Sequence, residues 1–498
     1  MSADAVFVSQ IMQYLKRFNT GKRLTTLDLS KLLLEYVPTT VVLMTHLERL
    51  SMAHNRIGTL EYQGGDELIL KRRANLVSMK VIGAPEQAIR VSIFPLVSLQ
   101  YLNVSSNVLV HLPIDLLLLT RLTSLDISKN RLTIFYLEFS LMSHLTEIAC
   151  LDNEWRSPHA SIMDRPAREI LSYMSAVLEA HTTRSLVMNR WGLRAITTDV
   201  TLASNLAVLN VDSNQIELFS PDIANLKHLV KLHVRQNLVA TLPWEFVGLS
   251  DSLLLADFGE NRLKEVPGVV GTLSSLQTLL LDHNSLSKLP NSVGDLIWLE
   301  RLSVEHNALV SLPPTLPRLT SLLQLDVSFN QLRSLPLGIG RMVGLQELCV
   351  QNNQLQFLPE SVALCTDLHT LAFSFNEVSE IPAGVSQLTN LTHLSFRTNR
   401  IPMIPPALSR NILLVSMDYA ENPVADPPQL VLDEGFQSVM DYLKRMFDVT
   451  LSGHLDLRQH PRPCPPVPRQ RCPMAISLGA RLAGPCHRAC HVQSVGAR

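Results

Sequence analysis

Residues 322–336 are LLQLDVSFNQLRSLP, and residues 345–359 are LQELCVQNNQLQFLP. The two stretches align without a gap, and their asparagines, Asn330 and Asn353, are 23 residues apart. The same frame recurs along most of the chain, apart from one step of 24 residues from Asn237 to Asn261 and a gap of 61 residues from Asn153 to Asn214. The asparagines in phase are Asn107, Asn130, Asn153, Asn214, Asn237, Asn261, Asn284, Asn307, Asn330, Asn353, Asn376, Asn399 and Asn422. This period indicates a solenoid, in which each repeat buries its apolar side against its neighbours.

Each frame predicts its own local structure. Its alternating apolar residues predict a short strand with inward side chains, which in residues 322–336 are Leu322, Leu325, Val327 and Leu332. The amide of Asn330 can bond to backbone groups where the chain bends, so stacked asparagines would form a ladder. After Pro336, apolar residues at a spacing of three predict a short helix. The predicted fold is an α/β repeat solenoid, a horseshoe with parallel strands on its concave side and short helices or turns on its convex side.

A longer repeat divides the chain. Residues 11–30, 170–189 and 439–458 align with one another, each with a tyrosine and a repeat-opening leucine thirteen residues later. We interpret the shared segment as an amphipathic helix that caps or joins solenoid sections; a convex-side helix within one continuous solenoid is an equal alternative. The predicted boundaries are an N-terminal amphipathic capping helix at 1–23, a first array of about six repeats at 24–160, a helical linker or cap at 161–183, a second array of about eleven repeats at 184–428, a C-terminal capping helix with the start of an aborted repeat at 429–458, and a tail at 459–498.

The start of the first array and the tail of the chain are less regular. Weaker repeat copies occur at residues 24–32, 47–55 and 76–84, and residues 61–72 form an insertion between two of them. The tail at 459–498 is rich in Pro, Arg and Cys, has no acidic residue and shows no period. This composition predicts disorder, or a sequence that is not the natural continuation of the reading frame.

Composition excludes several classes of protein. The 498-residue chain has a formal net charge of -1, whereas a nucleic-acid-binding face would be basic. Its mean hydropathy is +0.16, but no apolar run reaches the ~18 residues that a membrane span needs. The N-terminus lacks a signal-peptide pattern, and the widely spaced cysteines of the repeats give no disulfide-rich cap. These features predict a cytoplasmic protein.

The frame LxxLxxLDVSxNxLxxLPxxI with its period of 23 resembles that of the Ras-group-related intracellular leucine-rich-repeat proteins, which include Ras-pathway scaffolds. Residues 422–443, NPVADPPQLVLDEGFQSVMDYL, resemble the segment that ends the array in that group. The resemblance covers roughly residues 24–450. It implies a curved solenoid in the cytoplasm and protein partners in signalling, such as a small GTPase.

The chemistry of catalysis is missing from the motifs. The sequence contains no G-x-x-x-x-G-K-[ST], no H-E-x-x-H and no kinase signature set, so we expect no enzyme, cofactor or metal. His283 and His306 hold equivalent positions one repeat apart. They could share a metal ion, but a stacked pair of surface histidines is the favoured interpretation.

The binding surface is predicted on the concave face of the second array. Side chains between the leucines should point out of the core there, and five acidic ones follow one another. Basic residues flank them, namely Lys231, His233 and Arg235 before the acids and Arg397 and Arg400 after them. Equivalent positions lie ~4.8 Å apart, so Asp282 and Glu305 should be side by side and repel each other. The predicted partner-binding residues are Asp257, Glu260, Asp282, His283, Glu305, His306, Asp326, Phe329, Phe375, Arg397 and Arg400. The alternative is a solvated face whose charges serve solubility.

Three functions compete. The leading hypothesis is a non-enzymatic scaffold for protein–protein interaction. The second is the sensor portion of a larger GTPase-, cyclase- or kinase-linked signalling enzyme, whose catalytic part would be absent. The third, ranked lower, is a substrate adaptor for ubiquitin transfer.

Overall fold

The computed structural model describes residues 24–60 and 96–452, except positions 36, 39, 40, 42, 43 and 59. The predicted capping helix at 1–23, the weak repeat copy at 76–84 and the tail at 459–498 lie outside these residues. The chain divides into two units, Met1–Asp448 and Val449–Arg498. All elements described below belong to the first unit, apart from the last turn of the final helix.

The first sheet has five parallel strands in chain order within the described residues. Each strand is three residues long, and its central residue points into the core. The strands are β1 (Thr26–Asp28), β2 (Arg49–Ser51), β3 (Tyr101–Asn103), β4 (Ser124–Asp126) and β5 (Glu147–Ala149). Two 3-10 helices, η1 (Ile114–Leu118) and η2 (Leu137–Leu141), follow β3 and β4.

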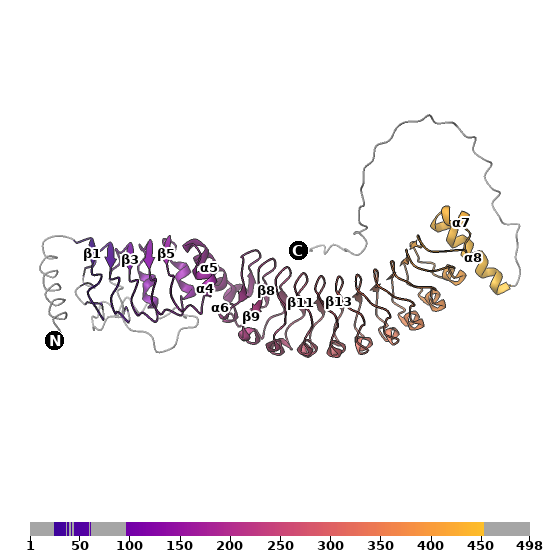
Figure 1. Cartoon of the computed structure of the whole chain (residues 1–498), viewed down its shortest axis with the longest axis horizontal. Helices are drawn as coiled ribbons and strands as arrows, with labels where there is room; N and C mark the ends of the chain where they lie inside the picture. The colour runs from indigo at the N-terminus through magenta and orange to yellow at the C-terminus, as the bar shows by residue number, and fades with distance from the viewer. Residues whose placement is uncertain are drawn as a thin grey trace, which may run out of the picture. The chain divides into compact units, whose positions relative to one another are not determined.

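Two helices separate this sheet from the next. They are α4 (Ala160–Met163) and α5 (Ala167–Thr183) (Figure 1). The buried residues of α5 recur at helical spacing, and they include Ile170, Met174 and Val177. Since α5 packs on η2 and also on the strand that follows it, the helix joins the two arrays through their cores.

The second sheet has eleven parallel strands, again in chain order. Its register advances by one repeat per strand, so Leu325 pairs with Leu302 on one side and Leu348 on the other. The strands are β6 (Ser185–Val187), β8 (Val208–Asn210), β10 (Lys231–His233), β11 (Leu255–Asp257), β12 (Thr278–Leu280), β13 (Arg301–Ser303), β14 (Gln324–Asp326), β15 (Glu347–Cys349), β16 (Thr370–Ala372), β17 (His393–Ser395) and β18 (Ser416–Asp418). A separate two-stranded sheet pairs β7 (Ala195–Ile196) with β9 (Leu218–Phe219). Along the chain, β7 follows β6 and β9 follows β8.

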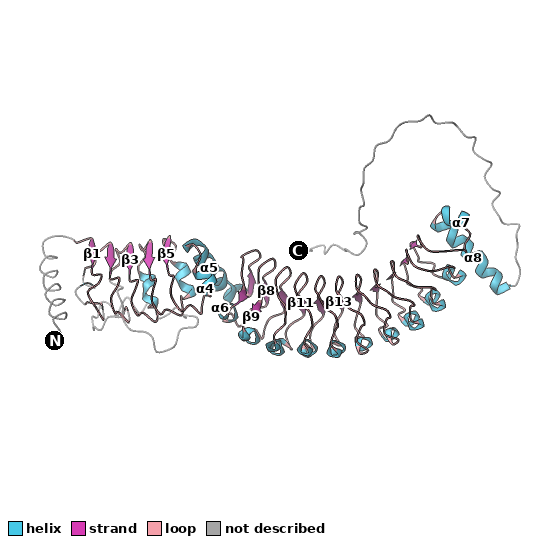
Figure 2. Cartoon of the chain, in the orientation of Figure 1, coloured by secondary structure: helices cyan, strands magenta, loops and turns pink. Residues whose placement is uncertain are grey.

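Short helices return the chain from one strand to the next. One is the α-helix α6 (Thr198–Thr201), and the others are 3-10 helices. The frame proline starts most of these turns, whereas Thr197 starts α6 and Ser220 starts η3. The carbonyl of Pro336, for example, accepts a hydrogen bond of 3.0 Å from the backbone N–H of Ile339. The 3-10 helices are η3 (Pro221–Asn225), η4 (Trp244–Leu249), η5 (Gly268–Thr272), η6 (Asn291–Asp295), η7 (Leu316–Arg318), η8 (Ile339–Arg341), η9 (Glu360–Leu364), η10 (Ala383–Gln387) and η11 (Pro406–Arg410). Figure 2 shows them in a row on one side of the array, away from the strands.

The core and the asparagine ladder follow the sequence frame. The side chains of Leu322, Leu325, Val327 and Leu332 are all at most 1% exposed. The amide nitrogen of Asn330 donates to three backbone carbonyls, among them Val304 of the preceding repeat at 2.9 Å, and its oxygen accepts from the N–H of Leu309 at 2.9 Å. The same bonds recur at the other ladder asparagines, such as Asn307 and Asn353. The prediction of a leucine-rich-repeat solenoid is confirmed.

Two more helices follow the last strand, namely α7 (Gln429–Asp433) and α8 (Phe436–Ser452). Val439 and Leu443 of α8 join the common core and are at most 1% exposed. Within the described residues, no helix combines the length and the apolar character that crossing a membrane requires.

Candidate functional site

The predicted binding residues except Arg400 lie on the strand face, which we define as the side chains one, two and four residues before each ladder asparagine. Arg400 instead follows its ladder asparagine, Asn399. The residue one before the asparagine has a left-handed backbone in repeat after repeat, with φ of 52° at His283 and 51° at His306. Because this turn is identical in neighbouring repeats, equivalent side chains leave the chain in parallel and lie one strand spacing apart, at ~4.8 Å. The strand face thus brings together residues that are 23 positions apart in sequence.

The upstream half of the acidic surface consists of Asp257, Glu260 and Asp282, and Arg235 lies among them. The Arg235 guanidinium donates to both oxygens of Asp282, with Nη1–Oδ1 at 3.1 Å and Nη2–Oδ2 at 2.8 Å. It also donates from Nη2 and Nε to Oε1 of Glu260, at 2.8 and 3.1 Å, and lies 3.8 Å from Oδ1 of Asp257. Paired arginine–carboxylate bonds of this kind are among the stronger charged contacts in proteins. The upstream acids therefore share one guanidinium, whose single positive charge offsets part of their negative charge.

Gly259 makes this arrangement possible. It occupies the position between Arg235 and Asp282 on the strand face, two residues before Asn261. A Cβ atom there would come within 2.4 Å of the Arg235 Nη1 and 2.8 Å of the Asp282 Oδ1. Because no side chain intervenes, the arginine reaches across one complete repeat. Burial lowers the pKa of Arg235, but its bonds to Asp282 and the charges of its acidic neighbours outweigh burial and raise that pKa above its usual value.

Two of the upstream acids are more buried than acids on a solvated surface would be. The side chain of Asp282 is only 6% exposed and that of Asp257 only 11%. Burial raises the pKa of Asp257, although a backbone hydrogen bond from Gly259 and the charge of Arg235 oppose it. The pKa of Glu260 is instead lowered, first by a hydrogen bond from Gln236 and then by Arg235.

The downstream half consists of Glu305 and Asp326. Within the described residues, the Glu305 carboxylate has no hydrogen bond or ion pair. Burial raises its pKa, and the nearby charges of Asp326 and Asp282 raise it further. Burial also raises the pKa of Asp326, against the hydrogen bonds that this carboxylate accepts from Ser328. Among the described residues, no arginine binds these two carboxylates as Arg235 binds Asp282.

A stack of rings runs beside the acids. The rings of His283 and His306 are stacked with centroids 4.2 Å apart, as the surface interpretation of this pair expected. The ring of Phe329 continues the stack at 4.0 Å from His306. The Phe329 side chain remains 37% exposed, so the stack ends in an accessible apolar surface next to unneutralised carboxylates.

Asp282, His283 and Glu305 could together hold a divalent cation, since one ligand atom from each lies within 4.8 Å of the others. Imidazole and carboxylate donors suit several such cations. Both oxygens of Asp282 are already bound by Arg235, however, and Oδ2 also lies 3.2 Å from Nδ1 of His283. A cation would have to displace the arginine, so the geometry favours the protein's own ion pairs.

The remaining predicted residues lie apart from this cluster. Phe375 holds the same repeat position as Phe329, but Asn352 stands between them. Arg397 forms an ion pair with Glu421, and Arg400 lies 3.2 Å from Glu377. The idea that basic residues only flank the acids is wrong for Arg235, which crosses into them.

Sequence reasoning placed Arg235 only on the flank of the acids, and it did not single out Gly259. The available signal was the glycine in the frame DFGEN, at a position where neighbouring repeats carry longer side chains. A position without a side chain, next to an arginine in the preceding repeat, indicates that the arginine side chain can extend over it to the following repeat.

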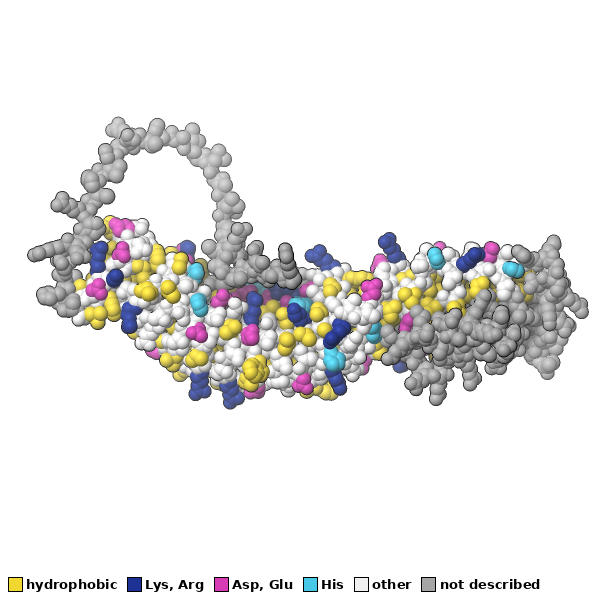
Figure 3. Space-filling view, turned by 180° about the vertical axis from the view of Figure 1, so that it is seen from behind, with side chains coloured by type: hydrophobic (Ala, Val, Ile, Leu, Met, Phe, Trp, Pro, Cys, Tyr) yellow, Lys and Arg dark blue, Asp and Glu magenta, His cyan; other side chains and the backbone are white. Residues whose placement is uncertain are grey.

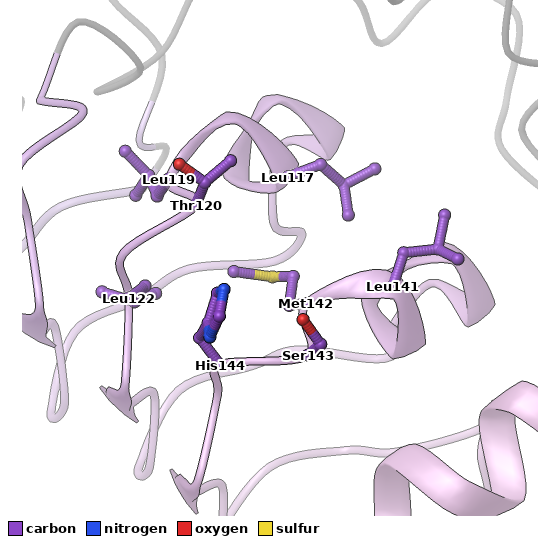
Figure 4. A pocket seen from close by; sticks show the side chains of 8 residues that line it. All are labelled: Leu117, Leu119, Thr120, Leu122, Leu141, Met142, Ser143 and His144. Atoms are coloured by element: carbon purple, nitrogen blue, oxygen red, sulfur yellow. The ribbon is translucent and has the colours of Figure 1, made fainter.

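A small pocket lies elsewhere, in the first array. It has a volume of about 150 Å³ and lies between the ends of η1 and η2 (Figure 4). Its lining is mainly apolar and includes Leu117, Leu122 and Met142, with His144 at one side. The pocket contains no carboxylate beside the histidine, and it shares no residue with the strand-face cluster.

No family model matches the sequence, and no curated protein does. Among solved structures, a leucine-rich-repeat protein of Leptospira interrogans is 22% identical, with 86% of this chain and 96% of that chain covered and a TM-score of 0.47. An internalin of Listeria monocytogenes is 17% identical, with 73% and 91% covered and a TM-score of 0.43. YopM of Yersinia enterocolitica is 22% identical, with 84% and 74% covered and a TM-score of 0.34. These likenesses are distant, and the fold assignment rests on the strands and the asparagine ladder.

Proposed function

We propose that the chain is a non-enzymatic scaffold that binds a folded protein partner on the strand face of the second array. The observation that carries the proposal is the contrast between clamped and unclamped acids. Burial raises the pKa values of Glu305 and Asp326, so holding these carboxylates charged costs stability, and within the described residues neither forms an ion pair with an arginine. Costly charges on an accessible surface are typical of binding sites.

The chemistry of this surface favours a partner with a basic patch. The exposed ring of Phe329 offers an apolar anchor, and the two carboxylates beside it attract lysine or arginine side chains. Such charges act mainly on the rate of association and on its salt dependence. The proposed contact residues are Glu305, Asp326 and the stacked rings of His283, His306 and Phe329. The upstream half supports these residues and does not itself contact the partner.

We further propose a cytoplasmic setting and a role in signalling, with a small GTPase among the candidate partners. This part rests on the resemblance to the Ras-group-related repeat proteins. Three cysteines of the repeats, Cys150, Cys349 and Cys365, are free and buried, which is consistent with a reducing compartment.

The test is a double reversal, Glu305→Lys with Asp326→Lys, compared with a charge-matched control, Glu265→Lys with Glu360→Lys, at exposed positions off the strand face. Asp282 is left unchanged because it holds Arg235. Partners captured by the wild-type chain are identified, and their Kd is measured at low and high salt. We expect the double reversal to weaken binding about tenfold at low salt, which corresponds to about 1.4 kcal/mol, and the control to have no effect.

A neutral pair, Glu305→Gln with Asp326→Asn, guards against misfolding of the reversed variant. It preserves side-chain shape and should still lower the salt dependence of binding. Unchanged affinity and unchanged salt dependence in both variants would assign the acids to solubility alone.

A further inference from the structure

Four side chains of two neighbouring repeats form a square around the bound arginine of the strand face. In this upstream square, Asp257 pairs in register with Leu280, and Gly259 lies beside Asp282. The two acids stand at opposite corners, and Gly259 leaves a third corner open. The Arg235 guanidinium lies over this open corner, with Nη2 2.8 Å from Oδ2 of Asp282 and Nη1 3.8 Å from Oδ1 of Asp257. The chain thus shows how one arginine fits between two acids on this face.

A second square, the downstream square, has the same parts. Ser303 pairs in register with Asp326, and Glu305 lies beside Ser328. The acids again stand at opposite corners, and the small serine side chains occupy the other two. Asp326 is also oriented as Asp257 is, because Oδ1 of each carboxylate accepts a hydrogen bond of 2.9 Å from the backbone N–H two residues later. Each square therefore offers two acids on a diagonal and a low corner between them.

The two squares differ in their cation. Among the residues that the structure describes, no arginine bonds to Glu305 or Asp326. Arg301 lies two residues before Ser303, and its charge opposes the rise in the pKa of Asp326 that burial causes. Arg301 forms no ion pair with any carboxylate of the described residues. The downstream square therefore has the two carboxylates of an arginine site, but the described part of the chain supplies no arginine to it.

An aromatic ring borders the downstream square where the upstream square has a carboxylate. Phe329 follows Ser328 in the chain, and its ring stacks on that of His306 at 4.0 Å. Glu260 holds the corresponding position beside the upstream square. Figure 3 shows acidic and histidine side chains close together on the strand side of the second array. A planar guanidinium can stack on a ring while it donates to a carboxylate, whereas the ammonium group of lysine has no plane to stack.

We propose that the downstream square binds one arginine side chain of the partner and selects it over lysine. This inference rests on the proposed function, because it names the chemical group that the partner presents to the strand face. The guanidinium lies over Ser328, donates to Glu305 and Asp326, and has the Phe329 ring beside it. The selection follows from geometry as well as charge, since the paired N–H groups of arginine match the two oxygens of a carboxylate.

The first experiment supplies the arginine from within the chain. Gln351 stands one repeat after Ser328, as Arg235 stands one repeat before Gly259. The variant Gln351→Arg with Ser328→Gly therefore places a guanidinium within reach of the square from the opposite side, and Gln351→Lys with Ser328→Gly is its matched control. In urea, we expect the unfolding equilibrium constant of the arginine variant to be about tenfold smaller than that of the lysine variant, a factor that corresponds to about 1.4 kcal/mol.

The acids provide the check on this result. Adding Glu305→Gln to both variants should remove the difference between them, because the guanidinium then loses a charged partner. Equal stability of the arginine and lysine variants, or a difference that survives Glu305→Gln, would overturn the proposal.

The second experiment supplies the arginine from outside. A tripeptide with arginine between two glycines, blocked at both ends, and its lysine counterpart are titrated into the full chain while the NMR signals of the Phe329 ring are followed. We expect the arginine peptide to bind about threefold more tightly, because only arginine pairs with a carboxylate through two N–H groups. The variant Gln351→Arg with Ser328→Gly should lose this response. Equal affinities for the two peptides would overturn the selection of arginine.

Deletion of residues 459–498 separates two sources of the arginine, because this tail contains arginines of its own. An unchanged affinity for the tripeptide supports a partner's arginine, whereas an affinity that rises on deletion would assign the square to the tail and overturn the choice of partner. The two proposals can also fail separately. Arginine selection without any effect of the double charge reversal on protein binding would remove only the proposed function, and the converse result would remove only this inference.

Discussion

The acidic surface of the strand face has two halves that look alike in sequence and differ in structure. In the upstream half, Asp257, Glu260 and Asp282 surround the guanidinium of Arg235, which crosses over Gly259. In the downstream half, Glu305 and Asp326 lie near each other with raised pKa values and no such clamp. Asp282 and Glu305 therefore hold equivalent repeat positions, and within the described residues only Asp282 of the two forms an ion pair with an arginine.

The difference shows how a repeat protein separates scaffold from binding surface. A partly buried carboxylate that is bound on both oxygens stabilises the neighbouring repeats, and its loss leaves charge uncompensated. A carboxylate kept charged without a partner lowers stability and is available to another molecule. Proteins commonly trade stability for function in this way.

The largest effect is expected from Arg235→Ala. Removing the cation leaves Asp282 and Asp257 buried without compensation, so we expect a loss of about 3 kcal/mol, the lower end of the range for a broken buried pair. The lower end applies because the Arg235 side chain is 32% exposed and water screens part of the interaction. Urea unfolding measures the change, with Arg333→Ala, an exposed arginine of the same array, as control. Gly259→Ala should reproduce part of the loss, because its Cβ displaces the guanidinium. Equal stability of Arg235→Ala and Arg333→Ala would break the comparison.

The asparagine ladder runs beneath both halves and should not distinguish them. Asn261 lies under the upstream half and Asn307 under the downstream half, and each makes the same four backbone bonds. Substitution of either by alanine leaves those backbone groups unpaired and should cost about 1–3 kcal/mol. Thermal unfolding of the two variants checks this. A clearly unequal cost would mean that the halves differ in their scaffold, and not only in their surface charges.

Neutralising the downstream half should give a small gain in stability. For Glu305 and Asp326, the folded-state pKa lies above the ordinary value, so their favourable contribution is present below the ordinary pKa and is lost as the pH rises through the raised one. Glu305→Gln with Asp326→Asn should therefore raise the free energy of unfolding at pH 7 by about 0.5 kcal/mol, the size of an exposed charge interaction. Unfolding followed from pH 7 to pH 4 should show the wild-type chain closing the gap. A loss of stability at pH 7 would contradict the assignment of these acids to binding.

The smallest effect is expected from the tail. Residues 459–498 contain no repeat, and they contain no acidic residue that could bind Arg235 in place of its present partners. Deleting them should leave the melting temperature and both halves of the surface unchanged. A lower melting temperature after deletion would show that the tail packs on the array.

The core could be predicted in detail from the sequence. The 23-residue period places Leu322, Leu325 and Val327 inside, and the structure buries all three. The bonding of Asn330 also follows from its position at the bend, because the same backbone groups are left unpaired in every repeat. Properties that repeat are determined locally, since each frame builds the same strand and turn whatever its outer side chains are.

The contacts of the Arg235 side chain could not be predicted from the repeat, and only the tertiary structure determined them. Its Nη2 atom lies 2.8 Å from an oxygen of Asp282, 47 residues away, and this contact depends on the space that Gly259 leaves. The half-burial of Tyr442 is a second example, since the same tyrosine at position 173 is covered by Trp191 and Asp199. The repeat pattern of the sequence determined the solenoid, its core and its ladder through local hydrogen bonding and apolar spacing. Which carboxylates pair with an arginine depends on long side chains and on neighbours that the period does not specify.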